Sequence, residues 1–156
     1  KKNHQICAMQ ALNFPSYNFR LKNTENTTLI FDVVRKKFVV LQPEEWVRQH
    51  AVHFLHSTKK YPKSLLNVEK QLEINGLKKR YDIILFNTDG SIHTLVECKA
   101  PNIAISQATF NQIAIYNLKL KATYLMVTNG LQHYYCQMDH QQEKYTFLRE
   151  IPDFSR

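Results

Sequence analysis

Two consecutive runs, 79–86 and 92–99, constrain the fold most, because each carries apolar residues on both of its faces. Apolar residues fill successive positions here, as in Ile83-Ile84-Leu85-Phe86, where a half-exposed strand would alternate with polar ones. Strands of this kind belong in the middle of a sheet that is covered on both sides. The turn signal Asn87-Thr88-Asp89-Gly90 joins the two runs. We therefore expect an α/β fold with a mixed central sheet flanked by helices.

The rest of the sequence supplies further elements for such a sheet. Pro43, followed by the acidic residues Glu44 and Glu45, predicts a helix that begins there and runs to about Thr58. A second helix is expected over 106–120. Short β-rich runs with turn residues between them predict the remaining strands at 28–34, 37–41, 65–74, 122–128, 131–138 and 145–151. Among the turn signals, Asn75-Gly76 and Asn129-Gly130 favour hairpins.

Length and composition indicate a single domain with a basic surface. The chain has 156 residues and a formal net charge of +8. We expect an N-terminal extension with a hairpin (1–41), a motif-bearing core (42–135) and a C-terminal strand and tail (136–156). Three cysteines without CxxC spacing favour free thiols and a cytoplasmic location, and no apolar run is long enough for a membrane span. The surplus of positive charge favours a polyanionic partner such as DNA.

Charged residues interrupt the two apolar runs and are the main candidates for a site. Burying an unpaired charge is costly, so Asp82, Glu97 and Lys99 need a compensating role. If Asp89-Gly90 forms a two-residue loop, Asp82 lies directly opposite Glu97, about 5 Å away, and Lys99 shares their face. A three-residue loop with a bulge would shift the register by one residue and separate the two acids.

Two adjacent carboxylates and a lysine suit metal-dependent phosphodiester hydrolysis. Mg²⁺ accepts one or two carboxylates and completes its coordination shell with water and phosphate oxygens, and Mn²⁺ is a substitute. A nearby lysine orients water and offsets the charge that develops on phosphate. The alternative is a cross-strand cluster of acids and lysine that only neutralises itself.

Five sequence segments together resemble a known nuclease family. Asp82 and Glu97-Cys98-Lys99 have the D…ExK form of the PD-(D/E)xK nuclease motif. The matching segments are Pro43-Glu44-Glu45-Trp46-Val47-Arg48, Lys79-Arg80-Tyr81-Asp82, Val96-Glu97-Cys98-Lys99-Ala100-Pro101, Gln112 with Tyr116, and Thr128-Asn129-Gly130. From about Gln42 to Tyr135 the chain is similar to the N-terminal nuclease domain of type I restriction enzyme R subunits. It resembles most the small stand-alone members from Bacteroides-type bacteria.

The resemblance implies a restriction-endonuclease-like fold and a set of functional residues. Asp82, Glu97 and the backbone carbonyl of Cys98 would bind the metal, and Lys99 would be the catalytic lysine. The Q-x-x-x-Y element falls on Gln112 and Tyr116, which share one helical face and would support DNA handling and cleavage.

Three further predictions concern the first helix, the basic residues and the missing motor. Related nucleases often place an acid of the first helix near the metal. Glu44 is preferred over Glu45, because a helical projection puts it on the face of Val47 and Ala51. Lys78, Lys79 and Arg80 are expected to contact DNA phosphates.

The chain contains no GxxxxGK[ST] phosphate loop and hence no ATP site, so translocation is not expected of it. The sequence therefore favours a Mg²⁺-dependent DNA endonuclease without the ATP-driven motor of the restriction subunit. The alternatives are a non-catalytic DNA-binding or accessory module, or an interaction subunit for a separate motor or restriction-modification complex.

Overall fold

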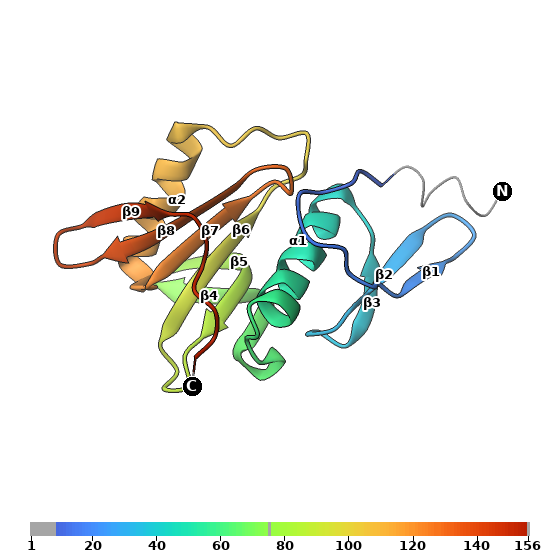
Figure 1. Cartoon of the computed structure of the whole chain (residues 1–156), viewed down its shortest axis with the longest axis horizontal. Coiled ribbons are helices and arrows are strands. Elements are labelled where there is room, and N and C mark those ends of the chain that lie inside the picture. The colour runs from blue at the N-terminus through green and yellow to red at the C-terminus, as the bar shows by residue number, and fades with distance from the viewer. Residues whose placement is uncertain (1–8, 75, 156) are drawn as a thin grey trace.

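Two sheets and two helices make up the protein in the computed structural model, which describes residues 9–155 except Asn75 (Figure 1). A three-stranded sheet has the order β1-β2-β3, and a six-stranded sheet has the order β4-β5-β6-β7-β8-β9. The strands are β1 (Leu21–Asn23), β2 (Thr28–Asp32), β3 (Lys37–Val40), β4 (Leu66–Ile74), β5 (Leu77–Phe86), β6 (Ile92–Cys98), β7 (Tyr124–Thr128), β8 (His133–Asp139) and β9 (Lys144–Leu148). The helices are α1 (Pro43–His53), which continues as a π-helical turn over Phe54–Thr58, and α2 (Gln107–Leu120), and a short 3₁₀ turn spans Lys63–Leu65.

The larger sheet is mixed, as the sequence predicts. Strands β6 and β7 are parallel and α2 connects them, whereas the other neighbouring strands of this sheet are antiparallel. The Asn129-Gly130 turn joins β7 to β8, and the side chain of Asn129 accepts hydrogen bonds from the backbone N–H groups of Leu131 and Gln132. The expected α/β fold with a mixed central sheet between helices is thus confirmed.

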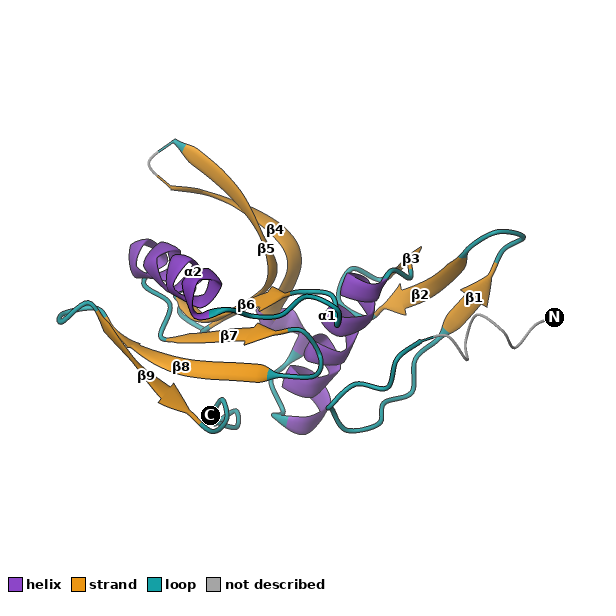
Figure 2. Cartoon of the chain, turned by 90° about the horizontal axis from the view of Figure 1, so that it is seen from above, coloured by secondary structure: helices purple, strands orange, loops and turns teal. Residues whose placement is uncertain are grey.

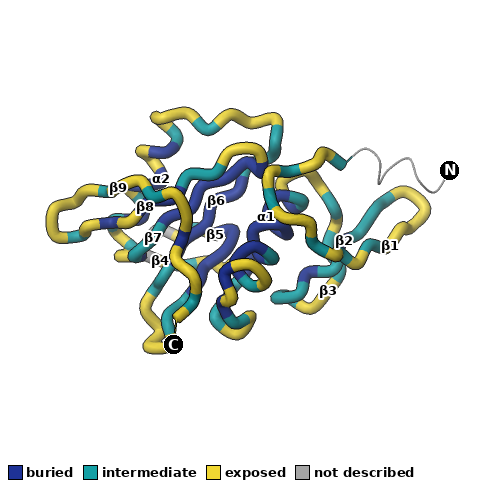
Figure 3. Tube along the Cα trace, in the orientation of Figure 1, coloured by how far each residue is buried: buried dark blue, intermediate teal, exposed yellow. Residues whose placement is uncertain are grey.

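The helices cover opposite faces of this sheet (Figure 2). Ile83 and Leu85 pack with α1, whereas Ile84 and Leu95 pack with α2. All four side chains are essentially inaccessible to solvent, and the buried parts of the two strands are residues 81–85 of β5 and residues 94–98 of β6 (Figure 3). The two-faced apolar pattern therefore has the predicted cause: these strands form the interior of the sheet.

Helix α1 lies between the two sheets (Figure 1), and seven of its eleven residues are buried. Aromatic side chains of the N-terminal segment pack on its outer face, where the rings of Phe19 and His50 lie 4.7 Å apart. Of the two acids in the first turn of α1, Glu45 is buried and Glu44 is exposed. Glu45 is buried because Arg35, which follows β2 of the small sheet, pairs with it on that side of α1.

The hairpin between β5 and β6 has the predicted register, although its loop differs from the predicted loop. The loop is not the expected two-residue turn: the backbone N–H of Asn87 donates to Ser91 O, so three residues, Thr88 to Gly90, form the loop. Phe86 pairs with Ile92, but Leu85 pairs with Thr94, so His93 is an extra residue in β6. This bulge offsets the loop by one residue, and Ile83 therefore pairs with Val96, the register that the two-residue loop predicts.

The structure also differs from the predicted elements at a few places. Strand β1 was not predicted, and β5 begins at Leu77, two residues earlier than expected. The predicted Asn75-Gly76 turn includes Asn75, which lies outside the described residues, as does Cys7. Of the described cysteines, Cys98 and Cys136 are free and buried. Within the described ranges, no helix is both long enough and apolar enough to cross a membrane.

Candidate functional site

Asp82 lies on β5 with both carboxylate oxygens held by neighbours. Its Oδ2 accepts a hydrogen bond from the backbone N–H of Cys98 at 2.8 Å, which ties β5 to the end of β6. Its Oδ1 accepts hydrogen bonds from Arg48 of α1, at 2.8 Å from Nη2 and 3.3 Å from Nε. Asp82 is 8% exposed, so its charge is balanced by these contacts more than by water.

Glu97 is the second buried carboxylate and is less well compensated. Its Oε1 lies 3.2 Å from Lys79 Nζ, an ion pair whose geometry is not that of a hydrogen bond, and this buried oxygen has no hydrogen-bond partner among the described residues. Burial raises the pKa of the Glu97 carboxyl, and the negative charge of Asp82 raises it further, although Lys79 and Lys99 oppose both effects. Two carboxylates thus share one poorly solvated region, where a cation would be stabilised.

Lys99 directly follows β6 and is partly buried. Its backbone N–H donates to Thr128 O at 2.8 Å, which extends the parallel pairing with β7 by one residue. Its positive charge acts to lower the pKa of two acids, Glu44 of α1 and Glu97 of β6. The pKa of Glu44 is raised by burial and by Asp82, and Lys99 partly offsets this rise as it does for Glu97. The charge of Lys99 is therefore near enough to Glu44 and Glu97 to affect the pKa of both.

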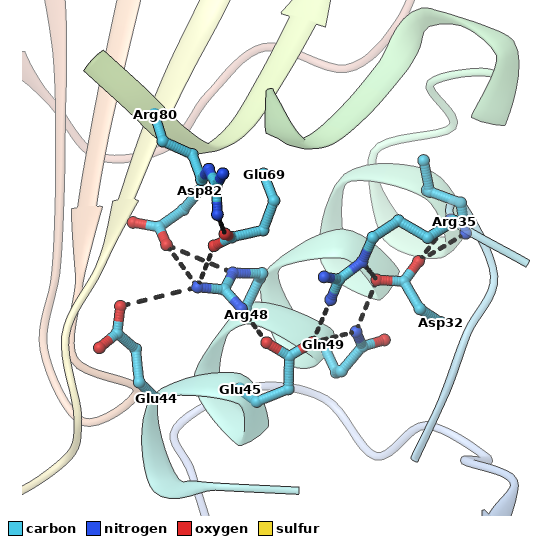
Figure 4. A network of polar contacts seen from close by, with 10 residues as sticks. Asp32, Arg35, Glu44, Glu45, Arg48, Gln49, Glu69, Arg80 and Asp82 are labelled. Atoms are coloured by element: carbon cyan, nitrogen blue, oxygen red, sulfur yellow. Dashed lines mark hydrogen bonds and ion pairs between the residues drawn. The ribbon is translucent and has the colours of Figure 1, made fainter. Parts of the chain in front are cut away.

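Arg48 stands at the centre of a cluster of carboxylates (Figure 4). Its Nη2 lies 2.6 Å from Glu69 Oε1 and 2.8 Å from Asp82 Oδ1, and 3.7 Å from Glu44 Oε1. Its Nη1 pairs with Glu45. Burial acts to lower the pKa of the guanidinium, but the contacts with Asp82 and Glu69 outweigh burial and raise it. Arg48 is therefore a charged cation inside the protein.

The same network extends away from Arg48 to the small sheet. Arg35 bridges Glu45 and Asp32, and Gln49 donates to Asp32 Oδ2 at 2.9 Å. Asp32 is completely buried, which acts to raise its pKa, but hydrogen bonds from Arg35 and Gln49 lower it overall. A continuous chain of charged and polar side chains thus connects β2 through α1 to Asp82.

Sequence reasoning missed five members of this network: Asp32, Arg35, Arg48, Gln49 and Glu69. Arg48 follows Glu44 and Glu45 by four and three residues, a spacing that predicts ion pairs on one helix but not a contact with β5. Glu69 has a backbone φ of +58°, at a gap in the pairing between Val68–Ile83 and Lys70–Tyr81. Nothing in the sequence signals this left-handed residue, because glutamate rarely adopts that conformation.

The residues predicted to contact DNA differ in their surroundings. Lys78 and Arg80 are exposed, and Arg80 lies 3.5 Å from Glu69 Oε2. Lys79 points inward instead: its Nζ lies 4.5 Å from the ring centre of Tyr116 and 4.8 Å from that of Tyr81. Tyr116 therefore connects α2 to Glu97 through Lys79, whereas Gln112, one turn earlier on α2, is exposed.

The carboxylates offer the kind of ligands that a hard divalent cation takes, but not a dense cluster. In the described part of the chain, no group of three or more His, Cys, Asp or Glu side chains is arranged to hold a metal ion. Asp82 and Glu97 are two such side chains, and Mg²⁺ needs no more than one or two carboxylates. The buried Oε1 of Glu97, which has an ion pair with Lys79 but no hydrogen-bond partner among the described residues, fits this requirement, and the two contacts of Arg48 with Asp82 oppose it.

Sequence comparison identifies the family. Residues 43–152 match the family described as type I restriction enzyme R protein N terminus (HSDR_N). The matched range covers more than half of the chain and contains Asp82, Glu97 and Lys99. The chain belongs to this family. Comparison with curated protein sequences gave no match.

Two solved structures are similar to the protein at low sequence identity. One is a candidate nuclease of DUF820 from Anabaena variabilis, with 14% identity, 74% coverage of each chain and a TM-score of 0.46. The other is a fragment of a candidate HsdR subunit of a type I restriction enzyme from Vibrio vulnificus, with 18% identity and a TM-score of 0.42. That match covers 67% of this chain but 23% of the Vibrio chain.

Proposed function

We propose that the protein is a metal-dependent DNA endonuclease that hydrolyses phosphodiester bonds. The observation that carries this proposal is the buried pair Asp82 and Glu97 beside Lys99, in a chain that belongs to a restriction-enzyme family. Burying two neighbouring carboxylates costs stability even where Arg48 and Lys79 pair with them, and a site with this cost favours a functional over a purely structural role.

Asp82, Glu97 and the backbone carbonyl of Cys98 would hold Mg²⁺, or Mn²⁺ in its place. Bound there, the cation would polarise the phosphate and lower the pKa of a water molecule. The hydrogen bond from Cys98 N–H keeps Asp82 oriented toward the end of β6. Lys99 would donate a hydrogen bond to the attacking water or to a phosphate oxygen and offset developing negative charge.

Residues around the acids would position the substrate. Lys78 and Arg80 are exposed on the same strand as Asp82, where they would contact DNA phosphates. Lys79 pairs with Glu97 in this structure, and Tyr116 would hold its side chain in place. Gln112 and Tyr116 would support DNA handling from α2. In this proposal the protein acts on DNA in the cytoplasm, alone or with a separate motor or restriction-modification subunit.

A second function is favoured by one specific observation. Arg48 already satisfies Oδ1 of Asp82, and Cys98 N–H satisfies Oδ2. A site that is neutralised internally suits a DNA-binding or accessory module of a restriction or DNA-processing complex that has lost catalysis. The two functions differ in whether Asp82 and Lys99 affect DNA cleavage or only its binding.

Cleavage of supercoiled plasmid and linear DNA over a range of Mg²⁺ and Mn²⁺ concentrations tests the proposal. We expect nicking that requires the cation and falls at least about 100-fold in Asp82→Ala and Lys99→Ala. The control Lys144→Ala removes an exposed lysine from β9 and should cleave like the wild type. Equal nicking by all variants would contradict the proposal, and cation-independent DNA binding without cleavage would favour the accessory function.

A further inference from the structure

The position of Arg48 carries an inference about how the site binds a cation. Its side chain is 10% exposed and lies within ion-pair distance of Glu44, Glu45, Glu69 and Asp82. One guanidinium thus faces several carboxylates, and its partner Asp82 Oδ1 is the oxygen that Cys98 N–H leaves free. Arg48 and a divalent cation would therefore compete for Oδ1 of Asp82.

We propose that Arg48 is the resident cation of the carboxylate site: it holds Asp82 in the metal-free protein and releases Oδ1 of Asp82 when a divalent cation binds. Arg48 is a positioning residue in this scheme, because it acts through Asp82 and not on the substrate. The inference rests on the proposed function, since it assumes that Asp82 is a metal ligand.

The surrounding contacts explain how Arg48 releases Asp82 without leaving a buried charge unpaired. Glu45 and Glu69 retain the guanidinium after Oδ1 is free, and Oδ2 stays fixed by Cys98 N–H. The positive φ of Glu69 belongs to this arrangement, because it falls where the β4–β5 pairing is interrupted opposite Asp82. A strained backbone at such a place is typical of functional sites.

Electrostatics give the direction of the effect on affinity. A guanidinium within a few ångströms of the binding position repels a divalent cation, and this repulsion is strong where water is excluded. Removing the positive charge while keeping a polar side chain should therefore tighten metal binding. It should also destabilise the metal-free protein, because Asp82 and Glu69 lose their shared partner.

Mn²⁺ affinity of the full chain, measured by electron paramagnetic resonance, tests this directly. We expect Arg48→Gln to bind Mn²⁺ about tenfold more tightly than the wild type, with a lower melting temperature without metal and a larger rise on Mn²⁺ addition. Arg48→Lys keeps the charge and should stay within threefold of wild-type affinity. The matched control Arg35→Gln removes another guanidinium of the network, which contacts Asp32 and Glu45 but not Asp82, and should also stay within threefold.

The outcomes separate this inference from the proposed function. If the wild type binds Mn²⁺ through Asp82 and Arg48→Gln binds it no more tightly, the inference is wrong and the nuclease proposal stands. If neither protein binds Mn²⁺ in a manner that Asp82→Asn abolishes, both are wrong. Tighter binding by Arg48→Gln supports the inference even where DNA cleavage is absent.

A measurement on the wild type covers the case in which Arg48→Gln does not fold. The Nε–H resonance of Arg48, assigned by its loss in Arg48→Lys, should shift on Mg²⁺ titration together with the backbone N–H of Cys98. The Nε–H resonance of Arg35, which donates to Asp32, should stay in place. A shift of Cys98 N–H at saturating Mg²⁺ without any shift of Arg48 would overturn the inference.

Discussion

At the scale of single residues, Glu97 is an acid whose ionised form is destabilised by its position in the fold. Its carboxyl is buried beside Asp82, and its pKa is raised by burial first and by the neighbouring charge second. A carboxyl whose pKa is higher in the folded state is destabilised in its ionised form at neutral pH, and the loss is relieved as the pH falls. Residues in this state are characteristic of sites that bind or react.

The substitution Glu97→Gln should therefore raise the melting temperature of the metal-free protein at pH 7. The amide carries no charge, so the desolvation and the repulsion from Asp82 both disappear, and together they exceed the lost ion pair with Lys79. Thermal unfolding beside the control Glu73→Gln, an exposed acid on β4, measures the effect. A melting temperature lower than that of the wild type would show that the ion pair dominates.

At the scale of single residues, the sequence predicts the acids and the lysine but not their partners. Asp82, Glu97 and Lys99 stand out because they interrupt apolar strands. Arg48, Glu69 and Asp32 do not, because their contacts join α1, β4 and β2 across long distances in the chain. Which side of α1 is buried depends on the small sheet, and a helical projection contains no information about it.

At the scale of elements, the β5–β6 hairpin shows how a correct register arises from an incorrect loop. The predicted two-residue loop and the observed three-residue loop differ by one position, which alone would turn Glu97 to the opposite face. The extra residue His93 restores the register before β6 reaches Glu97. Turn residues predict where a hairpin lies, but a bulge depends on packing that local sequence does not encode.

Two glycines in tight turns provide a matched test of turn packing. Both Gly130 and Gly90 have a positive φ, +85° and +88° respectively. A Cβ on Gly130 would lie 2.8 Å from a Leu12 methyl and 3.1 Å from a Val47 methyl, whereas a Cβ on Gly90 would meet nothing within 4 Å.

Gly90→Ala should therefore lower the free energy of unfolding by about 1 kcal/mol, which is the backbone cost alone. Gly130→Ala should lower it by about 2–3 kcal/mol, because the turn also packs against α1. Denaturant unfolding of the two variants measures both values. Equal decreases in the free energy of unfolding would mean that the Gly130 turn does not pack against Val47 in solution.

At the scale of the whole molecule, partly buried histidines shape the dependence of stability on pH. Burial lowers the pKa of His53, His93 and His133 in the folded protein. As the pH falls through the ordinary histidine pKa of about 6.5, the unfolded chain therefore binds protons that the folded protein does not bind. The histidine contribution to stability is fully present above that pH and is lost as the pH falls below it.

We accordingly expect the melting temperature to fall between pH 8 and pH 5.5. Glu97 acts in the opposite direction, so the measurement is best made on Glu97→Gln as well as on the wild type. The variant should show the steeper fall, because the opposing contribution of Glu97 is then removed. A melting temperature in Glu97→Gln that stays constant or rises toward pH 5.5 would contradict this account.

Residues from several elements of the fold meet at the predicted site. Asp82 and Glu97 come from adjacent central strands, Arg48 from α1 on one face and Tyr116 from α2 on the other. The mixed sheet and the family follow from the sequence, since they depend on hydrophobic pattern and motif spacing. The linkage of the site to the small sheet through Asp32 does not, because it depends on how two separate sheets pack around one helix.

The central claim is that Asp82 and Glu97 share one divalent cation. A crystal structure of the protein with Mn²⁺ tests it most directly, through the anomalous scattering of the metal. We predict one strong anomalous peak within coordination distance of Asp82 Oδ1, a Glu97 oxygen and the carbonyl oxygen of Cys98, with Arg48 turned to Glu45 and Glu69. A crystal at saturating Mn²⁺ in which Arg48 still binds Asp82 and no peak lies between the two acids would contradict the claim.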